Sequence, residues 1–187
     1  YPCCFCNCRS LTNVEFADGS QLVTIGKSSF MNSAIQSIKI PSSVKFIGSK
    51  AFLNCNGLEI VIFSEDSQLE EFSDYVFTNT KIEEMTIPMH VKRINTSCFP
   101  KTLKKIDFSE NSELEYIGER AFEKTVIENI IIPSSVEQIG PRAFAECHQI
   151  QTFSFRKNAV LDSIDSQVFL TSIIQKLIIP ANVKIIR

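Results

Sequence analysis

Apolar and polar residues recur along the chain at a nearly fixed interval, and phenylalanine marks that interval most clearly. One phenylalanine follows another every 22 to 25 residues, at Phe5, Phe30, Phe52, Phe77, Phe99, Phe122, Phe144 and Phe169. Three positions after each comes a small side chain that carries sulfur or a hydroxyl group, at Cys8, Ser33, Cys55, Thr80, Thr102, Thr125, Cys147 and Ser172. Such a period is typical of solenoids, in which neighbouring repeats pack together because one repeat cannot bury its own apolar face.

A second pattern, L-x-x-I-x-I/F, precedes each phenylalanine and predicts a short strand. Leu58, Val61 and Phe63 are one example, and the last two positions alternate inward and outward as in a strand. A second apolar pair follows each strand. The turns between them alternate between a short one after Ile-Pro and a longer polar loop after Phe, such as residues 64–68.

Glycine lies four residues before half of the phenylalanines, at Gly26, Gly48, Gly118 and Gly140, and other repeats carry Ser73, Asn95 or Asp165 there. Glycine mixed with Asn and Asp predicts a backbone position with positive φ. The residues that follow, such as 49–54, are expected to form one short helical turn. The sequence therefore predicts a β-rich repeat solenoid of about eight turns of 22–25 residues, with short parallel strands and one short helical turn per repeat.

The stretches IPSSVKFIGSKAFLNC (40–55) and IPSSVEQIGPRAFAEC (132–147) carry the whole motif. Through this motif the chain resembles the BspA-type leucine-rich repeat family. The resemblance covers residues 1–187, which are expected to form a single solenoid. The alternating turns are most similar to those of surface proteins from mucosal protists. The resemblance implies a cell-surface or extracellular location and adhesion to host proteins, host cells or other microbes. The family motif is structural, so it assigns no functional residue.

Composition excludes several classes of partner. Of 187 residues, 44% are hydrophobic and the net charge is −2, so no basic surface for nucleic acid or an anionic membrane is expected. No apolar run approaches the roughly 20 residues of a membrane-spanning helix, and no signal peptide starts the chain. Because the chain begins and ends inside a repeat, we expect it to be a fragment of a longer array.

The cysteines raise the question of a disulfide or a metal site. Cys55, Cys98 and Cys147 occupy columns of small inward residues, which predicts free thiols in the core. Four more, at Cys3, Cys4, Cys6 and Cys8, lie too close together for a typical zinc site. They are expected to be free thiols at the end of the solenoid, with a local or intermolecular disulfide left open. No metal and no cofactor are predicted.

No catalytic constellation is visible, and we expect the chain not to be an enzyme. Its two histidines, His90 and His148, are expected in exposed loops, and Cys147 beside His148 belongs to a structural column. Neighbouring acids such as Glu83 and Glu84 alternate across an extended chain, so they do not form an acid/base pair. Gly-rich phosphate loops and metalloprotease motifs are absent from the sequence.

The residues between the inward strand positions are the candidate binding surface, because they vary from repeat to repeat while the inward positions do not. We expect a protein partner to bind this strand face at Ile60, Ile62, Glu84, Thr86, Lys105, Asp107, Asn129 and Ile131. Outward isoleucines have two explanations, β-propensity or an interface. The long loops, with acidic residues at 65–66 and 110–113 and basic ones at 156–157, are a second candidate surface. A structural spacer without a ligand of its own is the alternative function.

Overall fold

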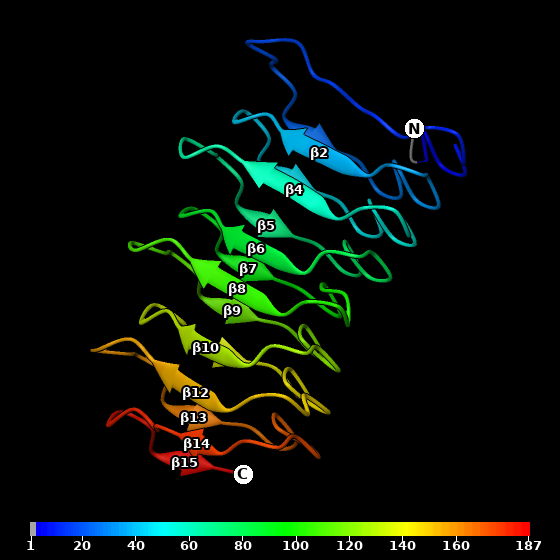
Figure 1. The fold of residues 1–187 in the computed structure, drawn as a ribbon. Helices are drawn as coiled ribbons and strands as arrows, with labels where there is room; N and C mark the ends of the chain where they lie inside the picture. Colours follow the sequence, from blue (N-terminus) through cyan, green and yellow to red (C-terminus); the bar gives the residue numbers. More distant parts are fainter. Residues whose placement is uncertain (1–2) are drawn as a thin grey trace.

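The computed structural model describes residues 3–187 as a β-solenoid of about seven turns (Figure 1). Most turns contribute a four-residue strand to one face: β2 (Ser37–Ile40), β4 (Ile60–Phe63), β6 (Glu84–Ile87), β8 (Lys105–Phe108), β10 (Asn129–Ile132), β12 (Thr152–Phe155) and the shorter β14 (Lys176–Leu177). A two-residue strand follows on the opposite side: β1 (Thr24–Ile25), β3 (Phe46–Ile47), β5 (Glu71–Phe72), β7 (Arg93–Ile94), β9 (Tyr116–Ile117), β11 (Gln138–Ile139), β13 (Ser163–Ile164) and β15 (Ile185–Ile186).

All strand pairs are parallel, which confirms the predicted fold class. The short strands β1, β3, β5, β7, β9 and β11 form one continuous sheet, and β13 pairs with β15. From the sequence we expected only an apolar pair at these positions, and the second sheet was not predicted. The long strands instead form three separate groups, β2-β4, β6-β8 and β10-β12-β14.

A column of phenylalanine rings runs through the solenoid from Phe5 to Phe169. Consecutive rings stack with centroids 4.8 to 6.3 Å apart and interplanar angles of 3 to 24°. Interior members such as Phe52 and Phe122 are fully buried. The period read from the sequence is therefore the period of the core, and each ring covers the faces of its neighbours.

The small residues three positions after the phenylalanines, from Ser33 to Ser172, have a hydrogen-bonding role. The hydroxyl of Thr125 donates to the carbonyl of Phe122 at 2.9 Å, and the thiol of Cys147 donates to the same carbonyl at 3.1 Å. Cys55 donates in the same way to the Phe30 carbonyl at 3.0 Å. A small donor suits this column because it satisfies a buried carbonyl without displacing the rings.

The expected short helical turn is wrong, since no helix occurs among the described residues. The chain around Phe52 instead makes successive tight turns, with positive φ at Lys50 (61°) and Asn54 (59°). Between these turns, the amides of Lys50 and Phe52 donate to the carbonyls of Asp74 and Val76 in the next coil, at 2.8 and 3.1 Å. Alternate amides therefore bond along the solenoid axis, which a helix would not permit.

The predicted positive φ in the glycine column is also wrong. Among the glycines that the structure describes, only Gly19, outside this column, has positive φ. At some positions of the column glycine is needed because neighbouring coils approach closely there. A Cβ on Gly48 would lie 2.8 Å from the Lys27 nitrogen, and one on Gly118 would lie 2.7 Å from the Asn95 carbonyl carbon.

The last coil exposes apolar side chains at positions that are buried in interior coils. Ile179 on this coil is exposed, whereas Ile132, which holds the same place in the repeat, is fully buried. Leu177 and Ile186 are likewise exposed. That the chain is part of a longer array stays a prediction.

Candidate functional site: the strand face

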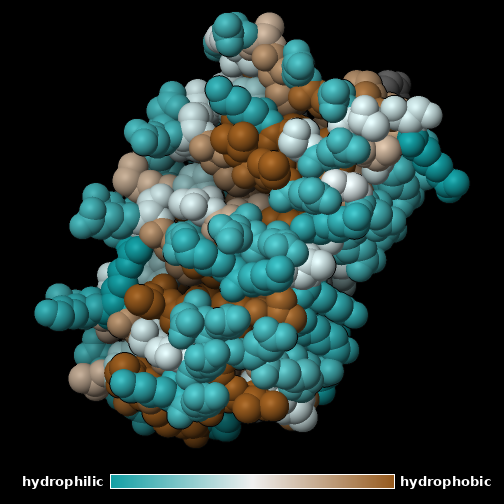
Figure 2. All heavy atoms as spheres, viewed as in Figure 1, coloured by the Kyte–Doolittle hydropathy of each residue, from teal (hydrophilic) through white to brown (hydrophobic). Residues whose placement is uncertain are grey.

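The eight residues predicted for the strand face all lie on β4, β6, β8 and β10 with their side chains exposed. Each alternates with an inward residue of the same strand, as the strand period requires. The isoleucines are prominent, since Ile60, Ile62 and Ile131 are 54%, 48% and 57% exposed. Figure 2 shows apolar areas separated by hydrophilic residues on the side viewed in Figure 1.

Two seams interrupt this face. The first seam lies between β4 and β6, and the second seam lies between β8 and β10. No hydrogen-bonded strand pairing joins the two strands on either side of a seam. Just before the strands, the amide of Lys81 still donates to the Leu58 carbonyl at 2.8 Å, and Val126 to Leu103 at 3.1 Å. The coils thus remain stacked while the strands beyond those bonds separate.

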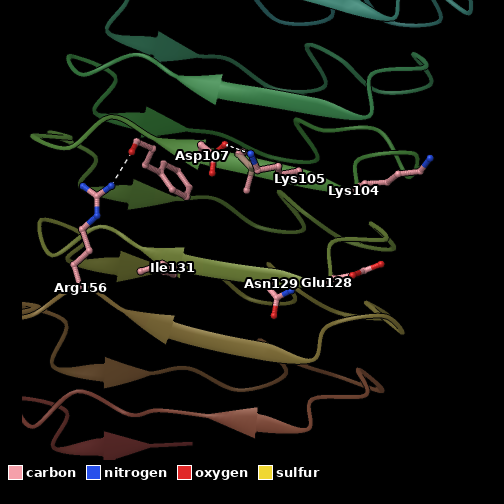
Figure 3. Close-up of a pocket in the computed structure, with 9 residues that line it drawn as sticks. Lys104, Lys105, Asp107, Glu128, Asn129, Ile131 and Arg156 are labelled. Atoms are coloured by element: carbon pink, nitrogen blue, oxygen red, sulfur yellow. Dashed lines mark hydrogen bonds and ion pairs between the residues drawn. The ribbon is translucent and has the colours of Figure 1, made fainter.

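Grooves lie along both seams, and the predicted residues line them. One groove of about 730 Å³ at the first seam includes Ile60 and Glu84. A second there, of about 450 Å³, includes Ile62 and Thr86. The groove at the second seam, of about 510 Å³, is lined by Lys104, Lys105, Ile106, Asp107, Phe108, Glu128, Asn129, Ile131 and Arg156 (Figure 3).

Two ion pairs lie beside the grooves. Lys105 and Asp107 form a 2.8 Å ion pair along β8, and Lys104 and Glu83 form another at 2.8 Å between coils. The hydrogen bond and charge of Asp107 raise the pKa of Lys105, so this lysine stays protonated at neutral pH. The face is therefore mixed in charge, and its exposed isoleucines distinguish it from an ordinary solvated surface.

Arg156 spans the second seam. Its guanidinium reaches from the loop after β12 past β10 and donates to the carbonyls of Phe108 at 2.7 Å, Ser109 at 2.8 Å and Glu110 at 2.6 Å (Figure 3). Sequence analysis named the basic residues 156–157 and the acidic loop 110–113 as parts of a second candidate surface. The partners of Arg156 are main-chain carbonyls at the end of β8 and the start of the loop that follows, so the contact links two coils without pairing with an acidic side chain.

Replacing Arg156 with Ala should lower the free energy of unfolding by about 1 to 3 kcal/mol, because three charge-assisted hydrogen bonds to carbonyls are lost. Chemical denaturation measures the change. Lys157→Ala is the control, because Lys157 is the exposed neighbour on the same loop, and it should change stability by less than about 0.5 kcal/mol. Equal losses in the two variants would contradict the bridging role of Arg156.

The histidines and core cysteines weighed as catalytic candidates are not arranged together. His90 is half-buried, not exposed as expected, and its Nδ1 lies 3.2 Å from Glu113 Oε1, while His148 is exposed. Cys147 is buried in the core, and burial raises the pKa of its thiol. The buried Cys55 and Cys98 also have a raised pKa because of desolvation, which disfavours the reactive thiolate.

Within residues 3–187, no three His, Cys, Asp or Glu side chains are arranged to hold a metal ion. The described part of the chain also contains no helix long and apolar enough to cross a bilayer.

The family model for the BspA type leucine-rich repeat region matches residues 1–102 and 70–187. The chain belongs to the BspA-type leucine-rich repeat family. No curated protein sequence is similar enough to count as a match.

Solved structures of other leucine-rich repeat proteins are similar to this BspA-type chain. The pneumococcal vaccine antigen PcpA is 25% identical with a TM-score of 0.58, over 91% of this chain and 51% of that one. A leucine-rich repeat protein from Bacteroides ovatus is 23% identical with a TM-score of 0.65, over 97% of this chain and 58% of that one. The BspA-type chain thus spans a little over half the length of these two structures, and the second likeness concerns the fold alone.

Proposed function

We propose that this chain is a non-enzymatic adhesion module of a cell-surface or extracellular protein, and that it binds a protein partner through the strand face. The observation that carries the proposal is the coincidence of exposed isoleucines with the two seams. Ile60 and Ile62 lie beside the first seam and Ile131 beside the second, so apolar contact area borders grooves that can receive partner side chains.

The repeat family supports this proposal, because leucine-rich repeats are generally protein-interaction scaffolds. The likeness to a pneumococcal vaccine antigen supports an exposed location, since antibodies must reach an antigen. Host cell-surface or matrix proteins, or the surface of another microbe, are the partners we expect. The grooves are lined by acidic as well as basic residues, and Lys104 and Lys105 are paired with acids, which favours a protein over nucleic acid as the partner.

Binding to epithelial cells and immobilised matrix proteins tests the proposal. A variant with Ile60→Lys, Ile62→Lys and Ile131→Lys should bind at least about tenfold more weakly, because charged side chains at an apolar contact lose burial and add desolvation cost. Val23→Lys, Phe46→Lys and Val160→Lys form the matched control, since these exposed apolar residues lie outside the grooves and the charge change is the same.

The control variant should bind like the unmodified chain, with folding of both variants checked by circular dichroism. Equal weakening in both variants would place the binding outside the strand face. No saturable binding by the unmodified chain to any of these surfaces would favour the alternative function, a structural spacer.

A further inference from the structure

The first described turn brings two cysteines together. Cys3 has positive φ (70°), and the amide of Cys6 donates to the Cys3 carbonyl at 3.2 Å. Residues that close a tight turn in this way have Cα atoms less than about 7 Å apart. That spacing lies within the usual range for a disulfide.

The same turn recurs in later coils, where its two ends bring side chains together. Arg120 and Glu123 stand at the corresponding positions, two before and one after the stacked phenylalanine. Arg120 also has positive φ (54°), and the Glu123 amide donates to the Arg120 carbonyl at 3.1 Å. Their side chains form an ion pair of 3.7 Å. Side chains at these two positions can therefore reach each other across the turn.

Cys3 and Cys6 occupy the same two positions of the turn around Phe5. Partial desolvation of Cys6, followed by the effects of the nearby Cys3 and Cys8, raises the pKa of the Cys6 thiol. Cys4 and Cys8 correspond in the repeat to the buried Cys98 and Cys55, but at this end of the solenoid Cys4 is exposed and Cys8 is half-buried. Among the described residues, Cys3 and Cys6 are the two cysteines that a turn hydrogen bond joins directly.

We propose that Cys3 and Cys6 are a dithiol that closes to a disulfide across this turn. A small-molecule disulfide such as oxidised glutathione is the oxidant. The thiolate of one cysteine attacks it and releases one glutathione thiolate, and the thiolate of the second cysteine then displaces the other. The two cysteine protons end on the two released glutathiones, so the chain loses two hydrogens and one glutathione disulfide becomes two glutathione molecules.

Closure would fix the turn that carries Phe5, the first ring of the core column. Phe5 lies between the two cysteines in sequence and stacks on Phe30 at 5.2 Å. Phe5 is 44% exposed, so it has little packing on its other side. A disulfide across the turn restricts the open conformations that would release this ring.

The pairing can be tested on the intact chain equilibrated with oxidised glutathione, trapped by alkylation and denatured. Cleavage after Phe5 and after Arg9 separates fragment 1–5 from fragment 6–9, and only a disulfide between the two fragments keeps them together. Mass spectrometry should find the linked fragments in the monomeric unmodified chain and in Cys4→Ser and Cys8→Ser variants. Cys3→Ser and Cys6→Ser should give at least about ten times less linked product.

Equal linkage in the Cys3→Ser variant would overturn the assignment. Linkage that depends on Cys4 or Cys8, or an unmodified chain that stays unlinked, would overturn it as well. None of these outcomes depends on adhesion, so the disulfide and the proposed function stand or fall separately.

Discussion

Replacing Phe122 with Ala should lower the free energy of unfolding by about 3 to 5 kcal/mol, the usual cost of removing a buried aromatic ring from a core. Phe122 is fully buried, and its ring stacks on Phe99 at 4.8 Å and on Phe144 at 4.9 Å. Removing it leaves a cavity in the middle of the column and removes contacts to two coils at once. Denaturant unfolding followed by circular dichroism measures the loss.

Phe46→Ala is the matched control, because it removes the same side chain from the solvent-exposed side of β3. Phe46 is 41% exposed and lies outside the ring column. The control should lose less than about 1 kcal/mol, mostly from β-propensity. Similar losses at Phe46 and Phe122 would mean that the phenylalanine column is not the main source of stability.

Gly118→Ala should destabilise the chain by about 1 to 3 kcal/mol, as adding one carbon to a well-packed site usually does. The new Cβ would lie 2.7 Å from the carbonyl carbon of Asn95 and 2.9 Å from the carbonyl oxygen of Ile94. These are backbone atoms of the neighbouring coil, so the whole coil must shift to relieve the contact. The shift in unfolding midpoint measures the cost.

Gly26→Ala is the control that distinguishes crowding by the neighbouring coil from any other effect of replacing glycine. Gly26 occupies the same column, but the nearest atom to a Cβ there is the Ser29 hydroxyl oxygen at 3.4 Å. Neither glycine has positive φ, so Gly26→Ala should leave stability unchanged or raise it by about 0.4 to 1 kcal/mol. If Gly26→Ala were as damaging as Gly118→Ala, close approach of the coils would not explain the glycine column.

Sequence reasoning predicted the repeat and its core because the inward residues must recur when identical coils stack. Phe52 and Phe144 lie 92 positions apart in sequence, yet each stacks between two other phenylalanine rings and both are fully buried. The conformation of the turns was harder to predict. Positive φ falls on residues such as Lys50 and Arg120, which carry no sequence signal for it, because bonds along the solenoid impose the backbone conformation.

The exposed positions of the strand face could be predicted from alternation, but the seams could not. From Leu58 to Ile82 and from Leu103 to Ile127, across the seams, the spacing is 24 residues. Ile150 to Ile174 has the same spacing, yet β12 pairs with β14. The spacing therefore does not decide where strands separate. Arg156 was also missed as a groove residue, since its contacts cross 46 to 48 positions of sequence.

The most direct test of adhesion through the strand face is photo-cross-linking on intact cells, with a photoreactive amino acid at position 62 or at position 46. Ile62 and Phe46 are similarly exposed, at 48% and 41%, but lie on opposite sheets. We predict saturable cross-links to a cell-surface protein from position 62, with little product from position 46. Cross-links from position 46 alone, or equally from both positions, would contradict binding through the strand face.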